Sequence, residues 1–125
     1  MSADKGSDHL AIAQAWTDAI TDGDRDGIEK LVAEDFVMWR NVTRATQERS
    51  EFINLAARLS SVLPGFRYTD VKRIATDDGF VQQHIVTGQG PSGQTFEAPA
   101  CIICQVQDGR ISKMDEYYDS AHDPR

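Results

Sequence analysis

The first half of the chain carries apolar residues at helical spacing in three stretches. The first follows Ser7, a residue type that caps helices, and ends at Gly23. The second begins after Asp24, and the third follows Thr46 and stops at Pro64. The expected apolar stripes are Leu10, Ala13, Trp16 and Ile20; Ile28, Leu31 and Val32; and Phe52, Ala56, Leu59 and Leu63.

The spacing changes to two in the second half, which indicates strands. Short Gly-containing turns separate the segments, and Asp-Gly between alternating segments is a strong hairpin signal. Pro99 predicts a bulge or bend in the long fourth segment. The expected strands cover residues 36–42, 66–75, 80–89, 94–107 and 110–119. Helices followed by a run of strands predict an α+β domain, with three helices packed on one face of a mostly antiparallel sheet.

Length and charge limit the possible functions. The 125 residues are expected to form one domain, 1–125, with frayed ends at 1–6 and 120–125. The net charge of −7, without a basic cluster, argues against nucleic acid as a partner. No apolar run is long enough to cross a membrane, and the polar N-terminus does not read as a secretory signal. We therefore expect a cytoplasmic protein.

The two cysteines, Cys101 and Cys104, lie three residues apart in an expected strand. Their side chains should therefore point to opposite faces, which disfavours a disulfide or a shared metal ion. We expect two free thiols, with Cys101 toward the interior of the domain and Cys104 on the opposite side.

The order of elements and three local sequence segments resemble one family. The segments AWTDAITDGDRDGIEKLVAEDFVMW (15–39), FRYTDVKRIATDDGFVQQHIVTGQG (66–90) and DGRISKMDEYYDSA (108–121) resemble the SnoaL-like group of the nuclear transport factor 2-like superfamily, which includes polyketide cyclases. The resemblance covers nearly the whole chain. It implies a conical, cystatin-like α+β barrel around a pocket, but many activities occur on this fold.

A comparison with ketosteroid isomerase, a relative in that superfamily, argues against steroid isomerisation. The alignment places its oxyanion Tyr on Trp16, its base Asp on Arg40 and its protonated Asp on Cys101. Arginine does not accept a proton at neutral pH, and a thiol is a poor hydrogen-bond donor. The isomerase mechanism needs both of these functions.

The same resemblance points to a Gln-x-His pair inside the cup. Gln82, His84 and Val86 share one strand face, which the alignment turns toward the cavity. Histidine can exchange a proton near neutral pH, and burial and a nearby carboxylate would shift its pKa in opposite directions. The alternative is a histidine that bonds a neighbouring strand or faces a subunit partner.

Carboxylates and one arginine are the expected partners of His84. The alignment points Glu97 and Cys101 inward on the next strand, with a solvated Glu97 near a strand end as the alternative. A cavity methionine of the isomerase aligns with Met114, which favours Glu116 and Tyr118 inside. Arg40 is expected at the cup mouth, where it would clamp an oxyanion or pair with Glu97 or Glu116. Further pocket walls are expected from Trp16, Met38 and Phe52, each of which has plain core packing as its alternative.

These residues favour a cofactor-independent enzyme without a metal site. It would act on a small hydrophobic carbonyl compound by proton transfer, in a cyclisation, isomerisation or dehydration. The expected catalytic residues are His84, Glu116, Glu97 and Arg40. A non-catalytic binding or dimer module is the alternative, and epoxide hydrolysis is a third hypothesis. Apolar residues on the outer sheet face, Trp39 and Tyr117 among them, predict a homodimer.

Overall fold

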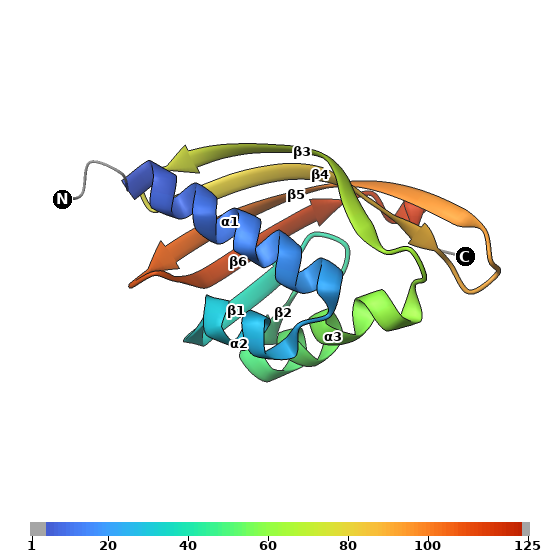
Figure 1. The fold of residues 1–125 in the computed structure, drawn as a ribbon, viewed down its shortest axis with the longest axis horizontal. Coiled ribbons are helices and arrows are strands. Elements are labelled where there is room, and N and C mark those ends of the chain that lie inside the picture. Colours follow the sequence, from blue (N-terminus) through green and yellow to red (C-terminus); the bar gives the residue numbers. More distant parts are fainter. Residues whose placement is uncertain (1–4, 124–125) are drawn as a thin grey trace.

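The computed structural model describes residues 5–123 and contains three α-helices and six strands (Figure 1). In chain order they are α1 (Lys5–Asp22), α2 (Arg25–Leu31), β1 (Val32–Arg40), β2 (Ala45–Glu48), α3 (Arg49–Val62), β3 (Arg67–Thr76), β4 (Gly79–Gln89), β5 (Thr95–Gln107), β6 (Arg110–Tyr118) and a 3-10 turn at Ser120–His122. Residues 1–4 and 124–125 of the segments expected to fray lie outside the described residues. The described part of those segments begins α1 and forms the 3-10 turn.

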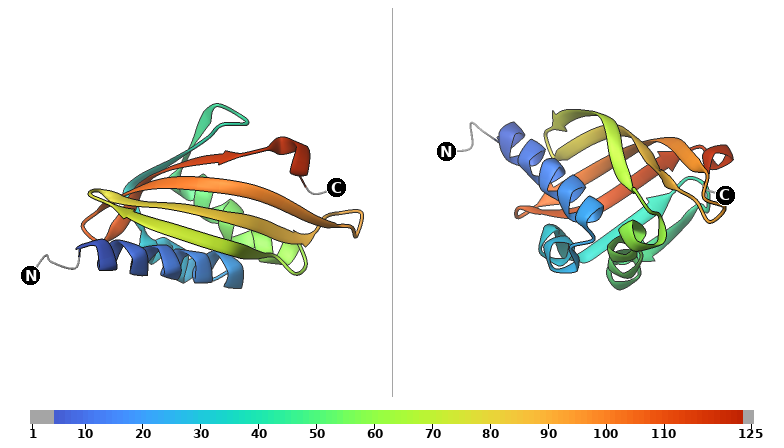
Figure 2. Two further views of the ribbon diagram at one scale, coloured as in Figure 1. Left: turned by 90° about the horizontal axis from the view of Figure 1, so that it is seen from above. Right: turned by 45° about the vertical axis from the view of Figure 1, so that its right-hand side comes forward.

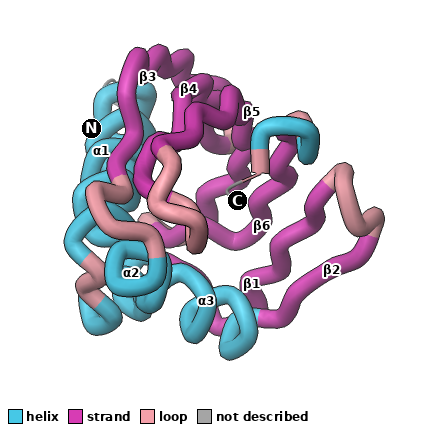
Figure 3. The backbone as a smooth tube through the Cα atoms, turned by 90° about the vertical axis from the view of Figure 1, so that its right-hand side faces the viewer, coloured by secondary structure: helices cyan, strands magenta, loops and turns pink. Residues whose placement is uncertain are grey.

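The strands form one mixed sheet in the order β2-β1-β6-β5-β4-β3. The last four strands are antiparallel neighbours, as the turn signals predict, and only β1 and β6 run parallel. The three helices lie on one side of the sheet (Figures 1 and 2), which curves from β3 round to β2 (Figure 3). This arrangement confirms the predicted α+β cone.

Local hydrogen bonds explain where α2 and α3 begin, whereas Ser7, the expected cap of the first helix, lies inside α1. The carboxylate of Asp24 accepts a hydrogen bond from the Gly27 amide at 3.0 Å, which confirms Asp24 as the cap of α2. The prediction that Thr46 caps the third helix is wrong. Residues 45–48 form β2 instead, and Glu48 and Glu51 make a reciprocal capping box at the start of α3.

The predicted bulge at Pro99 is also wrong, because β4 and β5 pair without interruption and Pro99 lies opposite Ile85. The pairing of β6 with β5 ends at Ala100 opposite Tyr118. Pro99 therefore lies one residue outside the stretch of β5 that pairs with β6, so its missing N–H removes no hydrogen bond between these two strands. Register shifts occur instead at Thr69–Lys72 in β3 and at Gln105–Val106 in β5.

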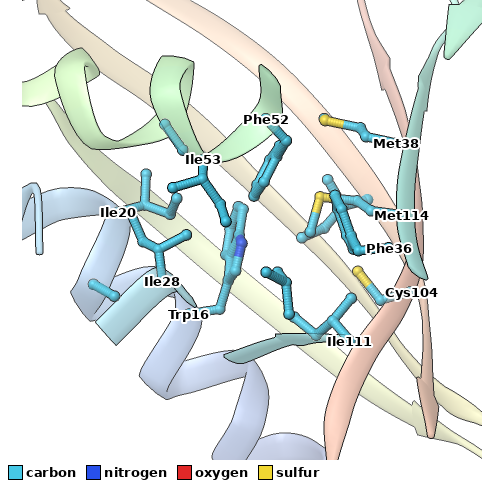
Figure 4. Close-up of a cluster of buried hydrophobic side chains, with 14 of the residues drawn as sticks. Trp16, Ile20, Ile28, Phe36, Met38, Phe52, Ile53, Cys104, Ile111 and Met114 are labelled. Atoms are coloured by element: carbon cyan, nitrogen blue, oxygen red, sulfur yellow. The ribbon is translucent and has the colours of Figure 1, made fainter. Parts of the chain in front are cut away.

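The hydrophobic core fills the space between the helices and the inner face of the sheet (Figure 4). Trp16 lies in the middle of this cluster, between the isoleucines of α1 and α2 and the strand residues Phe36 and Met114. The rings of Phe36 and Phe52 pack with centroids 4.8 Å apart. Burial of each such side chain stabilises the fold by about 1.5–3 kcal/mol.

Candidate functional site

A cavity of about 300 Å³ lies between α3 and the inner face of the sheet. Most of its wall is aliphatic or aromatic, and its polar groups gather toward the ends of β1 and β6. The lining residues are Arg40, Val42, Thr43, Leu55, Leu59, Leu63, Phe66, Tyr68, Val86, Phe96, Ala98, Ala100, Glu116, Tyr118 and Asp123. An apolar wall with a few convergent polar groups is the usual composition of a small-molecule site.

Arg40 and Glu116 form an ion pair in the wall of this cavity. The parallel register of β1 and β6 places the two residues side by side, and Arg40 Nε donates to Glu116 Oε1 at 2.8 Å. Arg40 Nη1 donates to Gln47 Oε1 on β2 at 3.0 Å. The two side chains of the ion pair are only 19% and 18% exposed. Partial burial strengthens such a charge-assisted bond and limits its screening by salt.

Tyr118 and Tyr68 add two hydroxyl groups to the cavity wall. Burial raises the pKa of Tyr118, and the carboxylates of Asp123 and Glu116 raise it further. Burial also raises the pKa of Tyr68 far above its usual value, and Glu116 adds to this effect. Both phenols are therefore protonated at neutral pH, and the Tyr118 hydroxyl is hydrogen-bonded to Asp123.

His84 lies behind the cavity wall, among aromatic rings. Its imidazole stacks on Tyr68 with centroids 4.2 Å apart, and the Trp16 indole lies 6.4 Å away. Its Nδ1 lies 3.0 Å from Gln82 Nε2. Gln82 in turn accepts a hydrogen bond from Arg73 Nε at 2.7 Å.

This environment holds His84 neutral. Burial lowers the pKa of His84 to about 4, and the positive charge of Arg73 contributes to the decrease. The expectation of a compensating carboxylate is wrong for this ring, because the charged neighbour is a guanidinium. His84 therefore carries no charge at neutral pH and is a weak base there.

The structure brings only part of the predicted set together. Arg40, Glu116, Tyr118 and Val86 line the cavity, whereas Gln82, His84 and Trp16 are buried beside it. Met38, Phe52 and Met114 belong to the hydrophobic core.

Glu97 and Cys101 lie on the opposite face of the sheet, so their predicted inward orientation is wrong. The register pairs His84 with Ala100 and Val86 with Ala98, which turns the even-numbered residues of β5 inward. Glu97 is exposed, and Cys101 lies on the outer face, where burial raises the pKa of its thiol. Cys104, expected outside, is 2% exposed and packs in the core. Both thiols are free, as predicted.

Tyr68 and Arg73 lie near the site but are not among the predicted residues. Tyr68 follows Phe66 at a spacing of two and faces Val86 across the β3–β4 ladder, which was a usable signal. Arg73 pairs with Gln82, but a register shift at Thr69–Lys72 precedes it, so simple alternation from Tyr68 does not place its side chain inward.

Two further features bear on the kind of site. Within residues 5–123, no group of three or more His, Cys, Asp or Glu side chains is placed to share a metal ion. Among the described helices, none is both long enough and apolar enough to span a membrane.

Solved structures of similar fold show what this chain resembles. A candidate polyketide cyclase from Xanthomonas campestris pv. campestris aligns at 23% identity with a TM-score of 0.80, covering 93% of each chain. The candidate polyketide cyclase IdmH from Streptomyces antibioticus aligns at 19% identity with a TM-score of 0.79, covering 90% of this chain and 93% of its own. An epoxide hydrolase of the LEH-like type from M. tuberculosis aligns at 19% identity with a TM-score of 0.78, covering 94% of this chain and 87% of its own.

Identities this low establish the fold and leave the chemistry open. No curated protein matches the chain at a significant level. The model of the SnoaL-like domain family matches residues 13–114. Since this match spans most of the chain, the protein belongs to the SnoaL-like domain family.

Proposed function

We propose that the protein is a cofactor-independent enzyme that removes a proton next to the carbonyl group of a small hydrophobic compound. The observation that carries the proposal is the Arg40–Glu116 pair in the wall of an otherwise largely apolar cavity. A cavity of about 300 Å³ is at the small end of the usual range for ligand sites, which suits a compound of one or two rings.

Glu116 is the proposed base. Its Oε1 accepts the bond from Arg40, and its Oε2 has no hydrogen-bond partner among the described residues. In the proposed step, the C–H electron pair moves toward the carbonyl group, the proton passes to Glu116, and an enolate oxygen forms. Cyclisation, isomerisation and dehydration can all begin with this step.

Arg40 and the phenols of Tyr68 and Tyr118 are the proposed stabilisers of the enolate. A fixed cation and fixed donors stabilise a developing oxyanion most when water is excluded, and this term is often the largest in catalysis. This proposal moves the base from His84 to Glu116, because Glu116 lines the cavity, whereas His84 lies behind its wall and its Nδ1 faces the Gln82 amide nitrogen.

The alternative is a non-catalytic module that only binds the compound. It is favoured by the position of His84, which does not line the cavity and has a guanidinium rather than a carboxylate as its charged neighbour. Epoxide hydrolysis is the less favoured third function, because within the described residues Arg40 has a single carboxylate partner rather than a flanking pair.

The first prediction tests whether the cavity is the site. We expect the protein to accelerate the exchange of α-protons for solvent deuterium in at least one member of a panel of cyclic ketones and β-keto esters, followed by ¹H NMR. Ala98→Leu should fill part of the cavity and lower the exchange rate by about tenfold or more. Ala45→Leu, on an exposed position of β2, is the matched control and should leave it unchanged.

Equal exchange by Ala98→Leu and the wild type would show that the cavity is not the site. Ligand binding by thermal shift without any exchange would favour the binding module.

We also propose a homodimer through the outer sheet face. Ile103 and Tyr117 are 45% and 44% exposed there, and the Trp39 and Tyr117 rings pack against each other. A broad depression of about 680 Å³, which includes Cys101 and Tyr117, lies on this face. A second copy of the same sheet is the occupant that fits an apolar face of this kind.

The second prediction concerns this dimer. In sedimentation equilibrium the wild type should behave as a dimer, and Ile103→Arg should shift it to the monomer, because a buried unpaired charge is costly. Val62→Arg, at a 55% exposed position on α3, should leave the dimer intact. A monomeric wild type at micromolar concentration would contradict the proposal.

A further inference from the structure

A chain of five polar side chains runs from the surface of α1 to His84. Gln14 Nε2 donates to Asp18 Oδ1 at 2.9 Å, and Gln14 Oε1 accepts from Arg73 Nη1 at 2.7 Å. Arg73 Nε donates to Gln82 Oε1 at 2.7 Å, and Gln82 Nε2 lies 3.0 Å from His84 Nδ1. Asp18 and Gln14 are exposed, whereas Gln82 is fully buried and His84 is 3% exposed.

The Arg73 guanidinium determines the direction of the hydrogen bonds in this chain of side chains. A guanidinium only donates, so both amides that contact Arg73 must present their oxygen atoms to it. The Gln82 amide nitrogen is thereby turned toward His84. Thr17 supports the same orientation, because its hydroxyl accepts from Gln82 Nε2 at 3.2 Å and from Arg73 Nη2 at 3.3 Å.

The direction of these bonds decides which imidazole nitrogen carries the proton. An amide N–H that points at His84 Nδ1 requires a lone pair there, so a neutral ring must carry its hydrogen on Nε2. His84 Nε2 is buried and has no hydrogen-bond partner among the described residues. The same is true of Trp16 Nε1, whose hydrogen can only be donated.

We infer that Arg73 is a positioning residue: acting through Gln82, it fixes His84 as an Nε2–H donor beside the cavity wall and keeps its Nδ1 from acting as a base. A buried donor left without a partner is costly, so an oxygen acceptor that reaches His84 Nε2 would be bound favourably. The ligand contact rests on the proposed function, whereas the tautomer is a property of the free protein.

The charged surroundings of the ring agree with this role. Arg73 and Tyr68 from β3 are the titratable groups that face it, and Trp16 is its neighbour from α1. No carboxylate of the described residues contacts the imidazole. A positive charge one amide away opposes the imidazolium and favours an uncharged or partly negative acceptor at Nε2.

The third prediction is a tautomer measurement on the free protein. Long-range ¹H–¹⁵N spectra at pH 7 should show His84 as a single neutral Nε2–H tautomer. The signals of the other two histidines are identified with His9→Gln and His122→Gln. An Nδ1–H tautomer or an imidazolium in the wild type would overturn the inference whatever the variants do. A protein without exchange activity would still show the tautomer, so the two proposals fail separately.

Three variants test the positioning role itself. Arg73→Met should free the Gln82 amide to rotate and give a mixture of both tautomers, and Arg73→Lys should restore most of the Nε2–H form. Gln82→Glu should accept from both neighbours, move the hydrogen to Nδ1 and raise the His84 titration midpoint by about one to three pH units. Gln83→Glu, on the adjacent exposed position of β4, should change neither quantity. An unchanged tautomer in folded Arg73→Met and Gln82→Glu would overturn the role of Arg73.

Discussion

Replacing Glu116 by Gln is expected to lower the rate of α-proton exchange by about 10²- to 10⁴-fold, the usual contribution of a general base. The amide keeps the size of the carboxylate and can still accept the bond from Arg40 Nε at its oxygen. It cannot take a proton from carbon at neutral pH. The apolar wall of the cavity is unchanged, so ligand affinity should change much less than the rate.

Glu97→Gln is the matched control, because Glu97 is exposed on the opposite face of the sheet. It carries the same chemical change on the neighbouring strand and should leave the exchange rate unchanged. If Glu116→Gln retained the full rate, Glu116 would not be the base. A comparable loss in both variants would instead indicate a general effect of net charge.

The second large effect concerns stability in acid. The pKa of His84 is lowered to about 4 in the folded protein, against about 6.5 for an unfolded chain. Between these values the unfolded state binds more protons, so the free energy of unfolding rises with pH in this range. The contribution of the neutral His84 to the free energy of unfolding is fully present above about pH 7 and is lost as the pH falls. The loss should reach about 2 kcal/mol at pH 5 and about 3 kcal/mol at pH 4.

Urea denaturation of the wild type and of His84→Asn, at several values between pH 7.5 and pH 5, measures this contribution. The difference in unfolding free energy between the two proteins should shift by about 2 kcal/mol across the range, because the variant lacks the buried imidazole. His122→Asn, at an exposed position, should show the same change of unfolding free energy with pH as the wild type. A constant difference for His84→Asn would mean that His84 titrates normally, and a wild type that gains stability in acid would indicate a hidden carboxylate.

Most of the fold could be predicted because its signals are local. Gly23 and Asp24 end one helix and cap the next, and the Asp-Gly turns define the hairpins. The failures occur where two signals compete. Thr46 has the chemistry of a helix cap, but pairing with β1 claims its backbone, and Glu48 and Glu51 take over the cap.

The site was harder to predict because it depends on register. The strand of His84 was oriented correctly, but β5 was assigned the wrong face, which misplaced Glu97 and Cys101 together. In a strand, an error of one residue exchanges every side chain between the two faces. The Arg40–Glu116 pair was anticipated as one alternative, since both residues lie near strand ends. Arg73 could not be placed from alternation, because the β3 register shift comes before it.

The hydrogen-bonded side chains from Asp18 to His84 affect how protons can move through the protein. A row of hydrogen-bonded groups relays protons only if each group can accept a proton from one neighbour and donate a proton to the next. Arg73 does not accept a proton, and it holds Gln14 and Gln82 in one orientation. Protons therefore cannot be relayed along this chain of side chains. On the proposed function, a proton that Glu116 takes from a bound compound therefore does not leave along this chain of side chains. If a bound compound covers Glu116, the same proton should return from Glu116 to a different carbon atom of the compound before the solvent can replace it.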